Sequence, residues 1–189
     1  DHGWDVDAQG IPCNQIELAY TLLTFSYVFL RGMRQLGQPL TQEDEEAYLH
    51  IWNVVGHVLG IEPRWMAHSM TEAADLFERI QARARTKNQM RAILDEVFPE
   101  YQQQALFSDP FGETSLALLS RYPTPAQLAA LDEAQLYALL HQHSQGHFGI
   151  DQTRRIQQAA CHSVGSPEAG RAFTPILPAF IAGFQTLSA

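Results

Sequence analysis

Helix start and stop signals recur along this chain of 189 residues, and they constrain the fold more than any other feature. Gly37 and Pro39 end an apolar segment that spans 16–36, and Gly60 ends the next one, over 42–59. Between these signals apolar residues recur three and four positions apart, and no segment alternates as a β-strand does. We therefore expect an all-α fold. The expected arrangement is a multi-helix orthogonal bundle, which could divide into two helical subdomains.

Further caps predict the remaining helices. Thr41 with Asp44 resembles a capping box at the start of the second helix. Thr71 is expected to cap a long third helix that could run to Phe98, where Pro99 ends it. Shorter helices are expected over 115–122, 126–131 (after Thr124), 133–144 (after Asp132) and 152–162 (after Asp151), followed by one from Ser166 that Pro175 and Pro178 should kink or break.

Hydrophobic periodicity also predicts which faces are buried. The first segment is apolar on two faces, so we expect it to be buried nearly all round. In the second helix, Trp52, Val55 and Leu59 form the expected apolar stripe. Trp4 and Trp65 are also expected in the core.

Composition excludes several classes of protein. With 12 Lys and Arg against 21 Asp and Glu, the net charge of −9 disfavours a cationic grip on nucleic acid along the whole chain. Cys13 and Cys161 lie far apart in apolar surroundings, which excludes a disulfide framework and suggests no catalytic thiol. No apolar run reaches the roughly 18 residues of a membrane span. We expect a cytoplasmic protein without a signal peptide, and the abrupt start at Asp1 suggests a piece of a longer sequence.

The charge is unevenly distributed. Residues 1–78 carry 12 acids and 3 bases, whereas residues 79–189 carry 9 of each. The step falls where the apolar stripe of the third helix weakens and basic residues dominate. A solvated face is the ordinary interpretation of such a run. The alternative is a basic face that contacts nucleic-acid phosphates, and its candidate residues are Arg83, Arg85, Lys87 and Arg91.

Histidines are the candidate metal or haem ligands. His50 and His57 lie two helical turns apart and so share a face, but no third ligand accompanies them. A structural role and a cofactor role both remain open for this pair. His141, His143 and His147 also cluster, yet Gly146 and Gly149 predict a solvated loop there. We expect no zinc site.

Several spaced blocks in the first part of the chain resemble one enzyme family. They are GIPCNQ at 10–15, LLTFS at 22–26, GMRQLG at 32–37, EAYLHIW at 46–52, VGHVLG at 55–60 and EAADLF at 72–77. Over residues 1–83 these blocks resemble the haem-b oxygenases of the rubber oxygenase (latex-clearing) and MpaB type. The resemblance implies an all-helical fold, haem b as cofactor and a small hydrophobic substrate whose carbon–carbon double bond is cleaved or oxygenated. It favours His57 and His50 as haem contacts.

The next part of the chain resembles a different family. Its blocks are KNQMRAILDEVFPEY at 87–101, FSDPFG at 107–112, LLSRYPTP at 118–125 and SVG at 163–165. Over residues 84–165 they resemble the central helical region of DEDD insertion-sequence transposases, the bridge-RNA-guided recombinases. That resemblance implies a helical linker with a helix-hairpin-helix-like region, and DNA or RNA as partner. Residues 166–189 are expected to form a C-terminal helix of uncertain origin.

These observations favour a truncated haem-dependent oxygenase of the rubber oxygenase or MpaB type, inactive alone. In that family the haem-ligating His and an Arg/Thr block lie upstream of the resembling stretch, so no catalytic residue is assigned. Two alternatives stay open. One is a nucleic-acid-binding fragment of a transposase, and the other is a recombined chimera without native activity.

Overall fold

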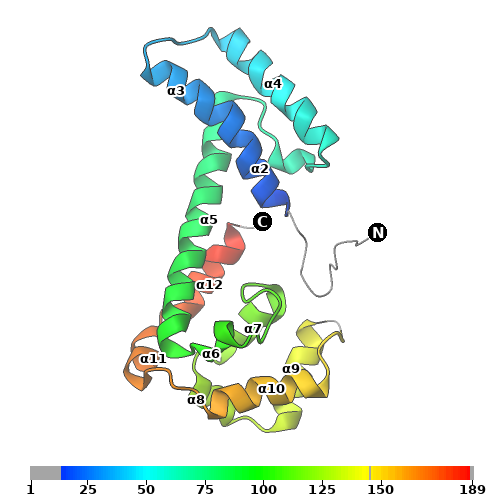
Figure 1. Cartoon of the computed structure of the whole chain (residues 1–189), viewed down its shortest axis with the longest axis vertical. Coiled ribbons are helices and arrows are strands. Elements are labelled where there is room, and N and C mark those ends of the chain that lie inside the picture. Colours follow the sequence, from blue (N-terminus) through cyan, green and yellow to red (C-terminus); the bar gives the residue numbers. More distant parts are fainter. Residues whose placement is uncertain (1–13, 145, 188–189) are drawn as a thin grey trace. The chain divides into compact units, whose positions relative to one another are not determined.

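The computed structural model describes residues 14–144 and 146–187, and within these ranges every regular element is a helix. The predicted all-α fold is confirmed. The chain divides into two compact units, residues 1–83 and 84–189, which we describe separately (Figure 1). None of the helices in the described ranges is both long and apolar enough to cross a membrane.

The first unit opens with one helical segment made of three parts: α2 (Gln15–Leu23), the π-helix η1 (Thr24–Val28) and α3 (Phe29–Gln35). Its extent agrees with the sequence prediction, and Gly37, at φ 73°, comes after its end as expected. The π-helical part was not predicted. Within it the Ser26 hydroxyl donates to the Leu22 carbonyl at 2.8 Å, and the Tyr48 hydroxyl donates to the Phe25 carbonyl at 3.3 Å.

Further helices complete the described part of the first unit. Thr41 caps α4 (Gln42–Val58), as predicted, and Gly60 takes φ 78° after the helix ends. A short 3-10 helix, η2 (Pro63–Trp65), leads to α5 (Met70–Val97), which continues past residue 83. The cap of α5 differs from the prediction. Ser69 rather than Thr71 accepts the Glu72 backbone N–H, at 3.2 Å.

The predicted apolar stripe of α4 is wrong. Val55 and Leu59 are exposed and Trp52 is half-buried, whereas the buried face is made of Glu45, Leu49, Asn53 and Gly56. Each polar or small member of this face has a specific partner. Asn53 donates through Nδ2 to the Ala67 carbonyl at 2.9 Å, and Gly56 lets Leu22 and Met66 approach its backbone closely. Hydrophobicity alone does not detect such pairing.

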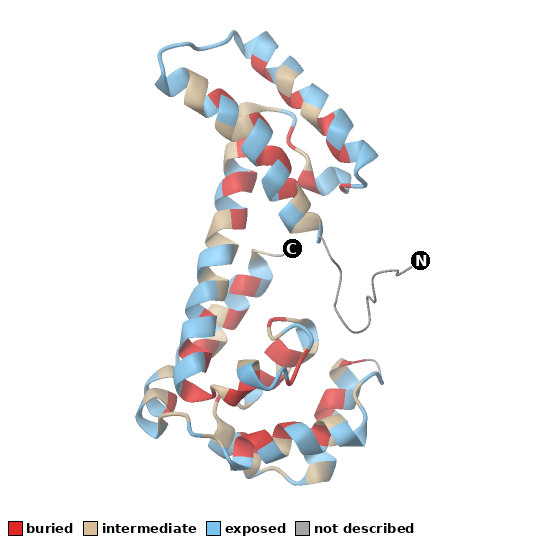
Figure 2. Cartoon of the chain, in the orientation of Figure 1, coloured by how far each residue is buried: buried red, intermediate tan, exposed pale blue. Residues whose placement is uncertain are grey.

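The first segment is also less buried than predicted. Tyr20, Phe25 and Phe29 are exposed, because each ring packs by one face against an aromatic ring of α4 or α5 and leaves the other to solvent. Leu36 is exposed as well. Trp65 is buried as predicted, while Trp4 and Cys13 lie outside the described residues. Figure 2 shows the alternation of buried and exposed positions along these helices.

The second unit contains the end of α5 and a series of shorter helices: α6 (Glu100–Gln103), α7 (Glu113–Arg121), α8 (Pro125–Ala129), α9 (Glu133–His143), α10 (Ile150–Cys161), α11 (Pro167–Phe173) and α12 (Leu177–Thr186). The predicted caps Thr124, Asp132 and Ser166 are confirmed, and so is the break at Pro175. At α10 the cap position is Gly149 rather than Asp151.

A fully buried tyrosine lies at the centre of the second unit. The Tyr101 ring contacts the rings of Phe98 and Phe107, and its hydroxyl lies 2.7 Å from the Ser115 hydroxyl. Burial strongly raises the pKa of Tyr101, and the Ser115 hydrogen bond only partly opposes this. The phenol is therefore neutral and acts as a packed, hydrogen-bonded core group.

Gly165 lies where two backbone segments of the second unit approach each other closely. The Ser166 N–H donates to the Glu96 carbonyl at 2.8 Å, which draws the chain before α11 against the end of α5. A Cβ on Gly165 would overlap the Val97 carbonyl. Only glycine fits here, because the neighbouring atom is backbone and cannot rotate away.

Replacing Gly165 therefore tests this contact. We expect Gly165→Ala to lower the free energy of unfolding by about 1–3 kcal/mol, because one of the two backbone segments must move to make room for the added methyl group. Gly183→Ala is the matched control. Gly183 lies in α12 with open space around it, so alanine there should stabilise by about 0.5–1 kcal/mol. Thermal unfolding followed by circular dichroism measures both. Equal stability of the two variants would contradict the close approach.

Candidate functional site

A paired arginine and glutamate form the strongest polar feature of the first unit. The Glu45 carboxylate is almost fully buried, and Arg34 from α3 contacts both its oxygens, with Nε donating to Oε1 at 2.6 Å. The Arg34 side chain is half-exposed. Its hydrogen bond to Glu45 raises the pKa of Arg34, and burial opposes this only in part. The two-point contact between the Arg34 guanidinium and the Glu45 carboxyl group fixes α3 to α4.

An open cavity of about 560 Å³ lies beside this pair. Its walls come from η1, α3, α4 and the start of α5, so it belongs wholly to the first unit. A second guanidinium, that of Arg31, lies 5.8 Å from the Tyr27 ring centre and 5.9 Å from that of Phe77. Such a cavity suits a small molecule with a carboxylate or another polar group. Within the described part of the chain its lining contains no histidine or cysteine, but it includes the hydroxyl side chains of Ser69 and Thr71.

The predicted haem contacts lie elsewhere on α4. His50 and His57 share one side of the helix, as their spacing predicts, but both are exposed and neither lines this cavity. Among the described residues, no group of three His, Cys, Asp or Glu side chains is placed to hold a metal ion. His143 ends α9 and His147 lies beyond it, so that cluster does not share one helix. Whether any of these histidines contacts a cofactor stays a prediction.

A buried carboxylate organises the second unit. Glu100 accepts from the Ser163 hydroxyl at 2.6 Å and from the Val164 N–H at 2.9 Å. Burial favours the neutral acid, but these hydrogen bonds outweigh it and lower the pKa of Glu100. The contact joins α6 to the loop after α10. Sequence reasoning missed both Glu100 and the Arg34–Glu45 pair, because nothing in the local pattern separates a buried Glu from an exposed one.

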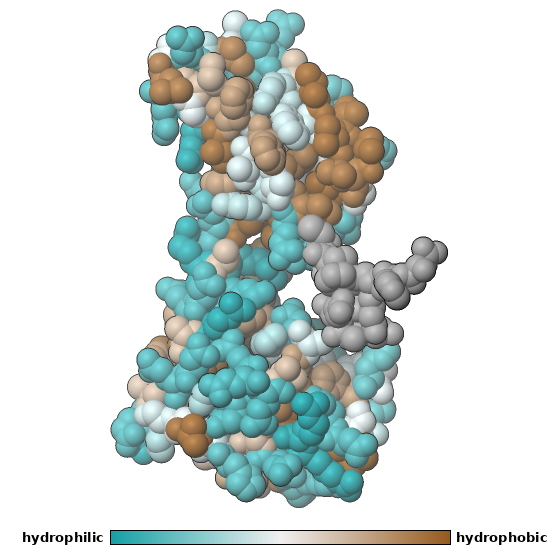
Figure 3. All heavy atoms as spheres, viewed as in Figure 1, coloured by the Kyte–Doolittle hydropathy of each residue, from teal (hydrophilic) through white to brown (hydrophobic). Residues whose placement is uncertain are grey.

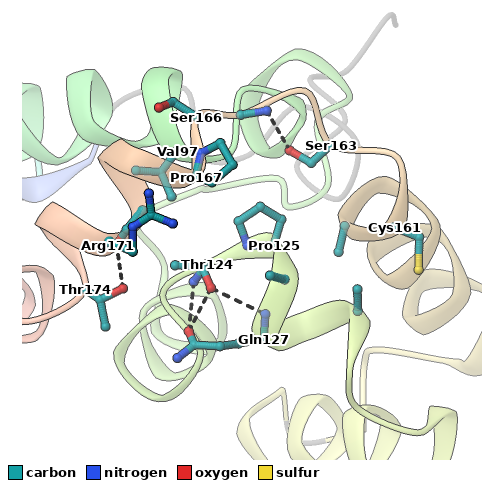
Figure 4. A pocket seen from close by; sticks show the side chains of 15 residues that line it. Val97, Thr124, Pro125, Gln127, Cys161, Ser163, Ser166, Pro167, Arg171 and Thr174 are labelled. Atoms are coloured by element: carbon teal, nitrogen blue, oxygen red, sulfur yellow. Dashed lines mark hydrogen bonds between the residues drawn. The ribbon is translucent and has the colours of Figure 1, made fainter.

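Next to this loop lies a second open cavity, of about 530 Å³ (Figure 4). Polar side chains from the start of α8 and from α11 surround it, including Thr124, Gln127 and Arg171. They bond to near neighbours, since Thr124 and Gln127 form a capping box and Arg171 pairs with Glu168. Cys161 also lines the cavity and is exposed, which corrects the apolar setting expected for it. These groups complete local structure and do not converge on a ligand position.

The predicted nucleic-acid residues all lie on α5. Lys87 and Arg91 each hold their cationic group over the Phe111 ring, at 5.3 and 5.8 Å, and Arg91 also donates to Gln102 at 3.1 Å. These two cations therefore help to pack the second unit. Arg85 is exposed and Arg83 is half-buried. A nucleic-acid contact by the four residues stays a prediction.

Comparison with known proteins decides the family. A family model described as "ER-bound oxygenase mpaB/B'/Rubber oxygenase, catalytic domain" matches residues 7–165. The chain belongs to this oxygenase family. A rubber oxygenase from Streptomyces sp. (strain K30) is 34% identical over 58 residues, which are 31% of this chain and 14% of that protein. The chain thus matches about a seventh of the length of this relative. No solved structure matches.

The oxygenase family match extends well beyond residues 1–83, which carry the oxygenase-like blocks of the sequence. It continues across residue 84 and through the transposase-like blocks to residue 165. It gives no support to a transposase origin for 84–165 or to a chimera, and both stay predictions. The oxygenase resemblance of residues 1–83 agrees with the family.

The first prediction from the site concerns the Arg34–Glu45 pair. We expect Arg34→Met to lower the free energy of unfolding by about 1–3 kcal/mol, because it leaves the Glu45 carboxylate buried without its partner. The double variant with Glu45→Met should regain most of that loss. Urea unfolding followed by tryptophan fluorescence reports on the first unit, because all 3 tryptophans lie within residues 1–83.

The exposed Arg64–Glu62 pair provides the control for this cycle. Glu62→Gln should change the unfolding midpoint little, because exposed ion pairs contribute about 0–1 kcal/mol. If Arg34→Met costs no more than Glu62→Gln, the Arg34–Glu45 pair does not hold the unit together.

The second prediction concerns pH. The pKa of Glu100 is lowered in the folded chain, so the unfolded chain takes up the proton first as pH falls. Glu100→Gln should cost about 1 kcal/mol at pH 7. The difference in free energy of unfolding between this variant and the unmodified chain should shrink once the pH falls below the ordinary Glu pKa of 4.5. Denaturant unfolding between neutral and acid pH measures this, with exposed Glu96→Gln as control. A difference that does not change with pH would exclude the carboxylate as its cause.

Proposed function

We propose that this chain is part of the catalytic domain of a haem-dependent oxygenase, and that it is inactive alone. The substrate class proposed is a small hydrophobic molecule with a carbon–carbon double bond. The observation that carries the proposal is the family match over residues 7–165, which includes most of both units. The name of the curated relative, a rubber oxygenase, agrees with the hydrophobic character of this substrate class but not with its small size, since rubber is a polymer.

The described residues do not themselves form a haem pocket. A haem group needs an axial ligand such as histidine, and its reactivity depends on the polarity and access of an enclosing pocket. His50 and His57 are exposed, and neither lines the cavity beside Arg34 or the cavity of the second unit.

In this proposal the chain contributes a helical scaffold to a larger domain. The Arg34–Glu45 pair and the Asn53 hydrogen bond hold α4 in one orientation against the helices around it. The cavity beside the pair offers a place for a polar or charged group of a ligand. The isolated chain is then expected to be inactive, because it matches only about a seventh of the length of the rubber oxygenase.

A segment exchange tests the proposal. The part of the Streptomyces rubber oxygenase that corresponds to residues 7–165 would be replaced by residues 7–165 of this chain. We expect the hybrid to keep a haem Soret band and to consume oxygen in the presence of rubber. The isolated 189-residue chain, mixed with haemin, should show neither. A folded hybrid that binds haem but has no activity would contradict the functional equivalence of the segment.

The same hybrid tests the sequence-based assignment of His57. Because His57 is exposed on α4, we expect His57→Ala to leave the Soret band unchanged. His50→Ala serves as the matched variant on the same side of the helix. A shifted or lost band in His57→Ala alone would establish His57 as a haem contact.

A further inference from the structure

One side of α4 is apolar and is not covered by the other described elements of the first unit. Ile51, Val54 and Val58 are 61%, 51% and 79% exposed, and Ala47 one turn earlier is exposed as well. The spacing of these four residues is four, three and four, so they form a single stripe that we call the α4 seam. Figure 3 shows hydrophobic side chains gathered in a band over α4.

The α4 seam cannot be buried by rotating the helix. It lies roughly opposite the buried face, at 100° per residue. That face is held by the Glu45 carboxylate bound to Arg34, by the Asn53 bond to the Ala67 carbonyl and by the close contacts of Gly56. Turning the seam inward would break all three. The seam is therefore a fixed feature of the folded unit, open to a second molecule.

The sequence of the seam is complementary to itself. When two α4 helices lie antiparallel and are related by a two-fold axis, Ile51 of one faces Val54 of the other. In the same register Ala47 faces Val58, so small residues meet larger ones in four layers. This alternation is what an isologous contact between identical chains needs. We propose that the α4 seam is a self-association surface, through which two copies of this chain pair antiparallel.

The available apolar area fits a weak, specific dimer. Three seam residues (Ile51, Val54 and Val58) together with Val55 and Leu59, which are 39% and 58% exposed beside the seam, offer on the order of 500 Å² per copy. A symmetric pair then buries about 1,000 Å², near the lower limit of specific interfaces. Association is therefore expected at high rather than low concentration.

The two borders of the seam differ in chemistry. Phe25 and Phe29 stack on Trp52 and Tyr48, with ring centres 5.5 and 5.4 Å apart, and continue the apolar surface on one side. His50 and His57 lie on the other side. In the antiparallel register, His50 of one copy comes next to His57 of the other. This gives the pairing a signature that a parallel dimer lacks.

The charge of the chain distinguishes pairing with a second copy from binding of a basic partner. The chain carries a net charge of −9. Glu43, Asp44 and Glu46 lie just before or at the start of the seam. Two copies therefore repel at long range, and added salt should strengthen their association by screening this repulsion. A cationic partner would behave in the opposite way. Salt dependence thus tests the nature of the occupant.

Sedimentation equilibrium on the full chain tests the dimer. Between ~10 and ~500 μM we expect concentration-dependent dimer formation that strengthens with salt. Val58→Glu should weaken it by about tenfold or more, and so should Val54→Glu. Val164→Glu is the matched control, because Val164 is 83% exposed in the second unit. Circular dichroism should show that each variant keeps its helix content. A monomer throughout this range, or equal effects of Val58→Glu and Val164→Glu, would overturn the proposal.

Disulfide trapping tests the register. In a chain with Cys13→Ser and Cys161→Ser, a mixture of His50→Cys and His57→Cys chains should form mixed disulfide dimers on mild oxidation. Either variant alone should form few. Efficient disulfides in each variant alone, or none in the mixture, would overturn the antiparallel arrangement.

Discussion

The buried carboxylate of Glu45 is the constraint on which the first unit depends. An ionised group in that position is stable only with a bound cation, and Arg34 provides it from α3. The contact sets both the distance and the rotation of α4. The rotation then decides which residues of α4 are buried and which form the exposed seam. It also places the two charged groups at the wall of the cavity in this unit.

Much of the fold could be predicted from local signals in the sequence. Caps such as Thr41, Thr124 and Asp132, together with the glycines after helix ends, act through short-range hydrogen bonds and backbone conformation, so they can be read residue by residue. The buried face of α4 could not be predicted this way. Its position depends on partners far along the chain, such as Ala67 for Asn53, and a hydrophobicity pattern contains no such information.

The candidate site is less predictable, for the same physical reason. The spacing of His50 and His57 correctly indicates a shared helix side, but it does not tell whether that side faces a cavity or solvent. The charge of Lys87 and Arg91 suggests a phosphate contact, yet both cover the Phe111 ring. Conversely, the Arg34–Glu45 pair joins different helices, and only the folded chain brings its two members together.

The π-helical part of the first segment controls the rotational phase of α3. One turn of a π-helix contains an additional residue compared with an α-helix, so every side chain after Val28 is rotated relative to a regular helix. Winding Thr24–Val28 as a regular α-helix with all of its residues kept would turn α3 by about 100° about its axis, which is the rotation that one residue contributes in an α-helix. Arg34 would then point away from Glu45. The irregular turn therefore acts as the spacer that aligns the cation with its buried anion.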